Sequence, residues 1–125
     1  MILGIGLDIV ETAALRRLLA EQGDRFARRV FTPAERAACA GRIDHEQALA
    51  ARFAAKEACL KALGTGVSAG LSFLQVEVAT ADDGVPSLTL SGAAAARAKE
   101  RGVRHVHVSL SHQPGMAAAA VILEG

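Results

Sequence analysis

Two acidic residues stand in apolar surroundings where an unpaired charge is costly. Asp8 is the only ionisable residue in the apolar run 2–10, and Glu57 follows Phe53 by four residues in the helical stretch 52–63. A buried carboxylate normally acquires a partner or a proton. Two acids from distant segments could share one hard divalent cation, because magnesium sites often use one or two protein carboxylates together with phosphate oxygens. The pair therefore indicates an enzyme that handles phosphate groups with Mg²⁺.

Each acid also has a simpler structural interpretation. Asp8 and Glu11 have the spacing of a helix capping box, so Asp8 could cap the first helix. Glu57 precedes Lys61 by four residues, which is the favourable order for an ion pair on a helix surface. The run 4–9 (GIGLDI) lacks the third glycine of a dinucleotide-binding fingerprint, and helices rather than a strand follow it. We therefore reject a dinucleotide site.

Basic residues accompany Glu57 on its helix. Arg52, Lys56 and Lys61 lie in the same stretch, which leads into the loop Gly64-Thr65-Gly66. The backbone of a glycine-rich loop can approach a ligand closely. Carboxylates that hold a metal ion, beside a lysine that neutralises phosphate oxygens, are what a diphosphate site requires.

Hydrophobic periodicity and turn residues predict an α+β fold of order β-α-α-α-β-β-α-β-β, with a mainly antiparallel sheet and a long helix packed on it. Thr32 and Glu35 form a capping box at one helix start, while Asp44 should cap the long helix and Ser91 the last one. His112 ends the fourth strand on its apolar side, where a structural role is the simpler interpretation. The predicted strands are 1–10, 73–79, 86–90, 103–111 and 116–123, and the predicted helices are 11–22, 24–30, 33 to about 41, 45–63 and 92–101.

Composition limits the core that this chain can build. The 125 residues fit one domain, 1–125, and 51% are hydrophobic, but Trp and Tyr are absent and Phe numbers 4. A small domain with few large apolar side chains buries little surface per residue. Association of protomers would relieve that limit, so we expect a homo-oligomer.

Charge and cysteine usage restrict the partners and the location. The net charge of +1 and the scarcity of aromatic residues argue against a nucleic-acid partner. Arginines are frequent between residues 16 and 42, which indicates either a solvated helix surface or a docking surface for an acidic partner. Cys39 and Cys59 have no zinc or redox spacing, and no apolar stretch has the length of a membrane span. We expect a cytoplasmic protein without membrane contact.

Three segments, taken in order, resemble the holo-[acyl-carrier-protein] synthases, the small single-domain branch of the 4'-phosphopantetheinyl transferase family. They are GIGLDIVE at 4–11, RFAAKEA at 52–58 followed by KALGTG at 61–66, and HVSLSH at 107–112. The resemblance spans nearly the whole chain. It implies transfer of phosphopantetheine from coenzyme A to a serine of an acyl carrier protein, with release of adenosine 3',5'-bisphosphate.

The resemblance also implies roles for individual residues and an assembly. Asp8 and Glu57 would bind Mg²⁺, and Glu57 and Lys61 would serve catalysis, with Lys61 in contact with the phosphates. The general base stays open between Glu57, a metal-bound water and a carboxylate of the carrier protein. The family forms homotrimers with active sites between protomers. The residues expected at the coenzyme A site are Arg52, Lys61, Gly64, Thr65, Gly66 and His112.

Docking of the carrier protein is where this chain departs from the family pattern. Members commonly have a basic residue three positions beyond the acid that matches Glu11, and here that position is Ala14. Because carriers are strongly acidic, we expect other basic residues to form the docking surface. The candidates are Arg16, Arg17, Arg25 and Arg28. Two other classes stay open, a non-catalytic coenzyme A-binding module and an alanine-rich structural oligomer.

Overall fold

The structure of the chain is a computed structural model that describes residues 1–68 and 70–125. Its elements follow the predicted order, with one short 3₁₀ turn added, which confirms the α+β class. No helix in these two ranges is long and apolar enough to cross a membrane. The elements are β1 (Ile2–Glu11), α1 (Thr12–Gln22), α2 (Asp24–Val30), α3 (Pro33–Cys39), α4 (His45–Leu63), η1 (Phe73–Gln75), β2 (Val76–Thr80), β3 (Pro86–Leu90), α5 (Gly92–Glu100), β4 (His105–Gln113) and β5 (Met116–Glu124).

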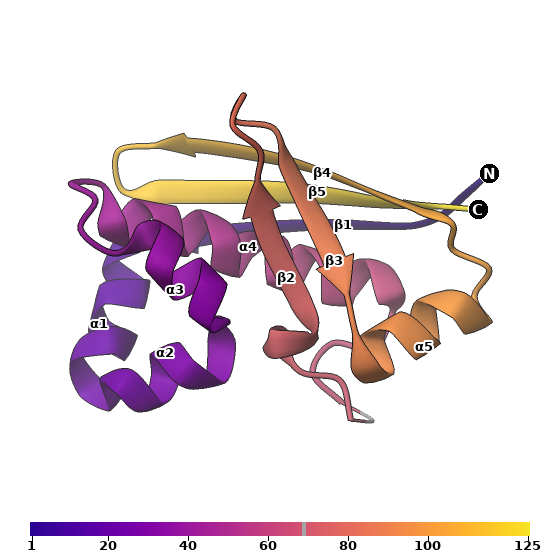
Figure 1. The fold of residues 1–125 in the computed structure, drawn as a ribbon, viewed down its shortest axis with the longest axis horizontal. Helices are drawn as coiled ribbons and strands as arrows, with labels where there is room; N and C mark the ends of the chain where they lie inside the picture. The colour runs from indigo at the N-terminus through magenta and orange to yellow at the C-terminus, as the bar shows by residue number, and fades with distance from the viewer. Residues whose placement is uncertain (69) are drawn as a thin grey trace.

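The strands form two antiparallel sheets. β5 lies between β1 and β4 in a three-stranded sheet, while β2 and β3 form a separate hairpin. The register places Asp8 of β1 and Leu110 of β4 opposite the same residue of β5, Ala119. Figure 1 shows α4 running beneath the three-stranded sheet, with α1–α3 towards one end and α5 towards the other. β1 and β4 are therefore the two edges of the sheet that covers α4.

Helix α4 begins and ends at the predicted residues, but its start is not capped as predicted. Gly64 adopts the left-handed conformation with φ of 83° and donates its N–H to Lys61, as expected of a C-terminal glycine. The prediction that Asp44 caps the helix is wrong, because its carboxylate accepts two hydrogen bonds of 2.8 Å from Arg42 instead. A nearby guanidinium competes well for these oxygens, since charge-assisted hydrogen bonds are the stronger ones. Ser91 likewise precedes α5 without a side-chain capping bond.

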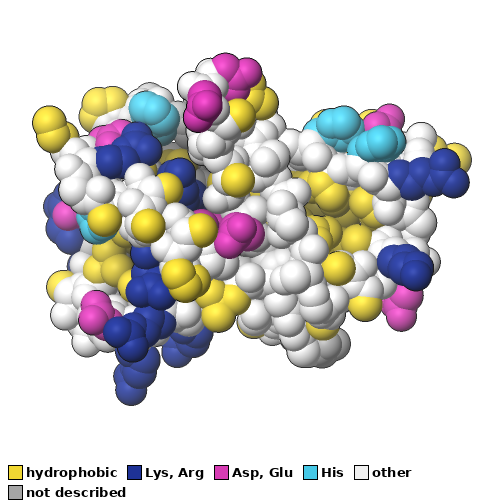
Figure 2. Space-filling view, viewed as in Figure 1, with side chains coloured by type: hydrophobic (Ala, Val, Ile, Leu, Met, Phe, Trp, Pro, Cys, Tyr) yellow, Lys and Arg dark blue, Asp and Glu magenta, His cyan; other side chains and the backbone are white. Residues whose placement is uncertain are grey.

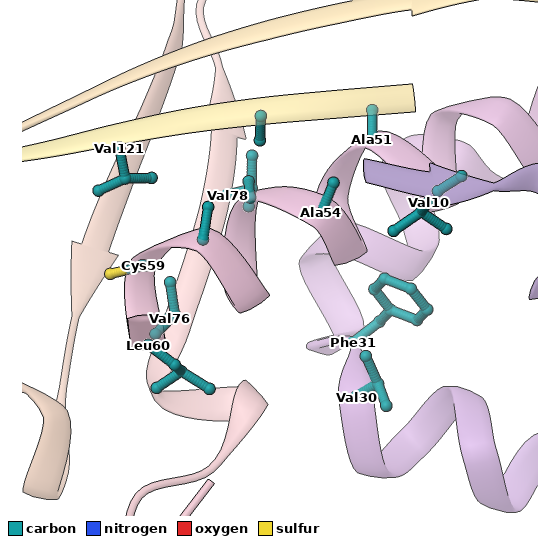
Figure 3. Packing of buried hydrophobic residues seen from close by; sticks show 14 of the residues in the cluster. Val10, Val30, Phe31, Ala51, Ala54, Cys59, Leu60, Val76, Val78 and Val121 are labelled. Carbon is teal, nitrogen blue, oxygen red and sulfur yellow. The ribbon is translucent and has the colours of Figure 1, made fainter. Parts of the chain in front are cut away.

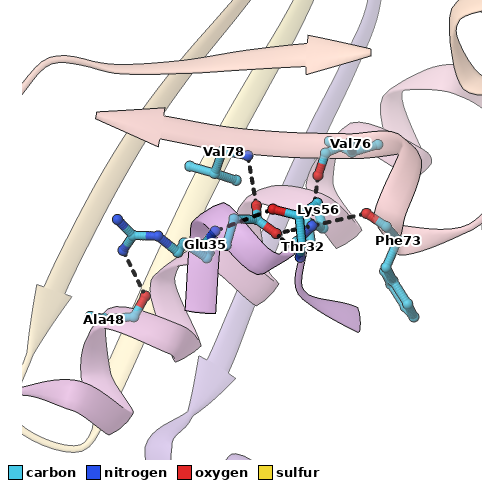
Figure 4. Close-up of polar contacts among 8 residues, drawn as sticks. Thr32, Glu35, Ala48, Lys56, Phe73, Val76 and Val78 are labelled. Atoms are coloured by element: carbon cyan, nitrogen blue, oxygen red, sulfur yellow. Dashed lines mark hydrogen bonds and ion pairs between the residues drawn. The ribbon is translucent and has the colours of Figure 1, made fainter. Parts of the chain in front are cut away.

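A buried ion pair joins α3, α4 and β2. The predicted capping box is present, and it leaves the Glu35 carboxylate pointing into the core. The Glu35 and Lys56 side chains have no exposed surface, and Glu35 Oε1 lies 2.7 Å from Lys56 Nζ. The other carboxylate oxygen accepts the Val78 N–H at 2.7 Å (Figure 4). Such complete hydrogen bonding is what offsets the cost of removing two charges from water.

The strand predicted at 73–79 begins three residues later than expected. Phe73–Gln75 forms a 3₁₀ turn, and β2 starts at Val76. Lys56 donates hydrogen bonds to the carbonyls of Phe73 (2.9 Å) and Val76 (2.7 Å), so the chain bends around its ammonium group (Figure 4). The alternation of apolar residues could not reveal this turn, because the side chain that holds it lies 17 residues away.

Small side chains on α4 let the sheet approach closely. Figure 3 shows Ala51 and Ala54 of α4 pointing towards the sheet, with Phe31 in the layer beyond the helix. Larger side chains fill the space on that far side, where the rings of Phe26, Phe31 and Phe53 meet edge to face. Helix α4 therefore presents small side chains to the sheet, and large aromatic side chains pack on its opposite side.

Strand β1 crosses α4 at backbone contact distance. A Cβ atom placed on Gly6 would lie 1.7 Å from the Ala58 carbonyl oxygen, and one on Gly4 would lie 2.3 Å from that of Ala62. Only glycine fits at either position. Because side chains alternate along a strand, Asp8 faces α4 in the same row as these two glycines. The crossing thereby places the Asp8 carboxylate against the helix.

Candidate active site

The Asp8 carboxylate forms an ion pair with one lysine, which binds only one of its two oxygens. Its side chain is 11% exposed, and Lys61 Nζ lies 2.8 Å from Oδ1 while also donating to the Leu7 carbonyl at 3.1 Å. The other oxygen, Oδ2, is buried without a hydrogen-bond partner among the residues that the structure describes. The capping interpretation of Asp8 is wrong, because the residue lies within β1 and α1 begins only at Thr12.

The second acid, Glu57, lies close enough to Asp8 to be affected by its charge. Burial, and then the negative charge of Asp8, raise the pKa of Glu57, while Lys61 opposes the shift. The lysine that could have formed a helix-surface pair with Glu57 makes its ion pair with Asp8 instead. The structure therefore brings the two predicted carboxylates and Lys61 into one place, from β1 and α4.

The donor atoms at this place suit a hard divalent cation. Two carboxylates supply only oxygen ligands. Asp8 Oδ2 has no partner among the described residues, and burial followed by the charge of Asp8 raises the pKa of Glu57, so a cation between the two groups would be favoured. Within ranges 1–68 and 70–125, no group of three His, Cys, Asp or Glu side chains is placed to hold a metal ion. An ion at Asp8 and Glu57 would therefore complete its coordination with water or phosphate oxygens, as Mg²⁺ commonly does.

The glycine loop follows directly from Lys61. Gly64 and Gly66 have φ values of 83° and 59°, which only glycine adopts without strain. The Thr65 hydroxyl donates to the Gly66 carbonyl at 3.3 Å, and the loop amides turn back onto the end of α4. The loop is thus adjacent in space to the lysine, as the sequence order suggests.

A separate cavity of about 380 Å³ contains the other two predicted residues, Arg52 and His112. Arg52 is only 6% exposed, and its guanidinium donates to the Ala48 carbonyl of its own helix, while Nε is buried without a partner among residues 1–68 and 70–125. A buried cation facing a cavity favours an anionic ligand. Arg42 also lines this cavity, which the sequence analysis did not anticipate. Its partner Asp44 lines the same cavity, and this pairing becomes visible only in the structure.

The predicted site is therefore split within one protomer. Asp8, Glu57 and Lys61 gather where β1, one edge of the sheet, crosses α4. The cavity lies at the opposite edge, where β4 contributes His112, and none of those three residues lines it. Arg52 and Glu57 share α4 but project from different sides of it.

The four predicted docking arginines are all exposed, but one of them forms an ion pair within the chain. Arg16 forms an ion pair with Glu46 of α4, which reduces the charge it offers to a partner. Arg17, Arg25 and Arg28 are exposed on α1 and α2. Figure 2 shows dark blue side chains gathered at the lower left, over the corner that these helices form in Figure 1.

The outer face of the sheet is apolar along β1. Ile5, Leu7 and Ile9 point away from α4 and are each more than half exposed. Ala118 and Ala120 of the neighbouring strand continue this face and are half-buried. Exposed apolar side chains that lie together in this way form a candidate interaction surface.

Comparison with known proteins gives a consistent result. The chain matches the family model of the 4'-phosphopantetheinyl transferase superfamily over residues 4–121. It is 53% identical to a holo-[acyl-carrier-protein] synthase of Anaeromyxobacter dehalogenans, with 100% of this chain and 98% of the relative covered. The crystal structure of the Neisseria meningitidis holo-[acyl-carrier-protein] synthase has a TM-score of 0.92 at 35% identity, with both chains fully covered. The Helicobacter pylori synthase in complex with coenzyme A has a TM-score of 0.84 at 31% identity, covering 96% and 99% of the two chains.

The chain therefore belongs to the 4'-phosphopantetheinyl transferase superfamily, and it is a transferase. The relatives that it matches over their full length are holo-[acyl-carrier-protein] synthases. The resemblance indicated by the three sequence segments is confirmed.

We expect Glu57→Gln to be at least as stable as the wild type at neutral pH without metal. The folded-state pKa of Glu57 is raised above the ordinary value of 4.5, so its charge disfavours folding, fully so above the folded-state pKa. The stability gain should disappear as the pH falls below about 4.5, where both states are protonated. Urea unfolding at pH 7 and pH 4 in a chelator measures this, with the exposed Glu100→Gln as control. A clear loss of stability at pH 7 would mean that the Glu57 carboxylate makes stabilising contacts without an ion.

Proposed function

We propose that this chain transfers the 4'-phosphopantetheine group from coenzyme A to a serine of an apo-acyl carrier protein, at a centre formed by Asp8, Glu57 and Lys61. The supporting observation is the Asp8 carboxylate, which pairs with Lys61 through one oxygen while the other is buried without a partner among the described residues, with Glu57 close enough for the Asp8 charge to raise its pKa. The Helicobacter pylori relative is in complex with coenzyme A, a molecule with a diphosphate group. Asp8 and Glu57 would hold a Mg²⁺ ion, which when bound supplies charge neutralisation on the diphosphate oxygens.

The side chains have distinct parts in this reaction. The carrier serine hydroxyl attacks the phosphorus that bears the pantetheine arm, and adenosine 3',5'-bisphosphate leaves. Lys61 is 54% exposed, so its ammonium group can contact phosphate oxygens beside Asp8. Transfer of this kind depends on positioning and charge stabilisation rather than on a covalent protein intermediate. The expected cytoplasmic location agrees with Cys39 and Cys59, which are buried free thiols.

We expect Asp8→Asn to lower the transfer rate on the order of 100-fold or more, because an electrostatic contribution of this size is lost with one charged group. The measurement is the gain of one phosphopantetheine group by apo-carrier protein, followed by mass spectrometry with coenzyme A and Mg²⁺. Asp82→Asn, in the exposed hairpin turn, is the matched control. Normal transfer by a folded Asp8→Asn variant would contradict the proposed centre. A wild-type chain that binds coenzyme A without modifying any carrier would instead be the non-catalytic binding module.

The split site supports a homotrimer with active sites between protomers. A second copy on the apolar face of β1 would bury Ile5, Leu7 and Ile9. It would also bring its own β4 edge, with Arg52 and His112, near the β1 edge that contains Asp8. The buried Arg52 guanidinium would then bind a phosphate of coenzyme A whose diphosphate lies on the neighbouring protomer. The loop at 64–66 would line the same ligand next to Lys61.

We expect Leu7→Glu to dissociate the assembly, because a charge on the apolar face would be buried without a partner. Sedimentation velocity should give three times the 12.9 kDa chain mass for the wild type and one chain mass for the variant. Val85→Glu is the control, since Val85 is exposed to a similar extent (58% against 61%) on the β2–β3 turn. A wild-type chain that sediments as a monomer, or an unchanged variant, would contradict this interface.

The exposed arginines of α1 and α2 are proposed to bind the acidic carrier protein. Arg17, Arg25 and Arg28 present positive charge and, within residues 1–68 and 70–125, have no ion pair like that of Arg16 with Glu46. Charge complementarity at an exposed surface mainly affects encounter and orientation. The missing basic residue at Ala14 would then be compensated by neighbours on the same surface.

We expect Arg17→Glu and Arg28→Glu to raise the KM for carrier protein several-fold while the KM for coenzyme A changes little. The reason is that reversal repels the acidic partner without altering the coenzyme A site. Steady-state kinetics with each substrate varied separately measures the effect, with Arg104→Glu as an exposed control at the other end of the chain. Equal changes in both KM values would refute a docking role.

A further inference from the structure

The C-terminal end of α4 is completed by residues outside the helix. The last four carbonyl groups of a helix have no partner within it. In α4 two of them accept loop amides, and the other two accept guanidinium groups from α5 and the residue that follows it. The donors are Gly66 N–H to Leu60 (3.4 Å), Gly64 N–H to Lys61 (2.9 Å), Arg101 to Ala62 (2.8 Å) and Arg97 to Leu63 (3.3 Å).

Arg101 does more than complete the helix end. One nitrogen of its guanidinium donates to the Ala62 carbonyl, and the other donates to the Leu3 carbonyl of β1. The planar group therefore bridges α4 and β1, which only an arginine fork does with two fixed donors. The Ala62 oxygen that it binds is also the atom against which Gly4 packs. Arg101 thus lies at the crossing that brings β1 onto α4.

The bridged carbonyls lie close in sequence to the proposed centre. Ala62 directly follows Lys61, and Leu3 is on the same strand as Asp8. A shift at one point of a strand or helix also moves the residues further along it, because hydrogen bonds make these elements rigid. Two cations at the C-terminal end of α4 also interact favourably with the helix dipole. Arg97 and Arg101 additionally approach Gly64, at the start of the 64–66 loop.

We propose that Arg101, assisted by Arg97, is a positioning residue for the transferase centre. It holds β1 and the last turn of α4 in the register at which the Asp8 carboxylate meets Lys61. This inference rests on the proposed centre, because it assigns to Arg101 an effect exerted through Asp8 and Lys61. Neither arginine touches these two side chains in the structure, so the effect is indirect.

The test compares Arg101→Leu with Arg101→Lys and with Arg104→Leu, an exposed arginine three residues on. Hydrogen–deuterium exchange of the metal-free protein should show faster exchange in peptides covering 3–9 and 60–66 in Arg101→Leu, and no change in Arg104→Leu. The Mg²⁺ concentration for half-maximal transfer should rise on the order of 10-fold, as is typical when a group that supports a metal ligand is lost. The KM for carrier protein should stay unchanged, and Arg101→Lys should be intermediate because it keeps the charge without the fork.

The possible results distinguish a failure of the Arg101 role from a failure of the proposed centre itself. The positioning role would be overturned if Arg101→Leu lowered the melting temperature but kept the wild-type Mg²⁺ dependence, with hydrogen–deuterium exchange raised equally throughout the chain. Arg101 would then contribute to stability alone. If Arg101→Leu does not fold, Arg97→Leu replaces it, and wild-type behaviour of that variant would also overturn the inference. If Asp8→Asn leaves Mg²⁺ dependence intact, the centre itself is wrong, whatever the Arg101 variants do.

Discussion

The close passage of β1 over α4 is the constraint on which the rest of the structure depends. Gly4 and Gly6 meet the carbonyl oxygens of Ala62 and Ala58, and no side chain can be added at either glycine without moving the strand. The strand therefore lies nearer to the helix than ordinary sheet-on-helix packing allows. Because side chains alternate along β1, the same row places Asp8 against α4. The acidic centre is a consequence of backbone contact, not of local preference.

Two neighbouring residues of α4, Lys56 and Glu57, lie in very different electrostatic environments. Lys56 pairs with Glu35 and donates to two carbonyls, so its charge is fully satisfied. Desolvation lowers the pKa of Lys56, and the Glu35 carboxylate opposes this shift. At Glu57 burial and a second carboxylate raise the pKa instead. Fully paired charge organises the core, whereas a carboxyl group whose pKa is raised by burial and by a second carboxylate is a candidate functional group.

The division of the proposed site between two edges would give an oligomer a chemical role. One protomer places carboxylates and a lysine at the β1 edge, and a buried arginine facing a cavity at the β4 edge. A ligand with a diphosphate at one end and a further phosphate at the other can span two such edges from different copies. The exposed apolar face along β1 would supply the contact surface for the proposed association. Burial of the same surface would compensate for the modest core of a small chain.

The sequence alone determined the features that depend on nearby residues. The order of the elements, the Thr32–Glu35 capping box and the end of α4 at Gly64 all follow from local patterns, and the three family segments indicated the chemistry. Only the tertiary structure decided which partner each charged group takes. Asp44 binds Arg42 rather than the helix start, Lys56 bends residues 73–75 into a turn, and Lys61 pairs with Asp8 rather than Glu57. These choices depend on side chains brought together by packing, and a one-dimensional pattern contains no information on the distances at which charges compete.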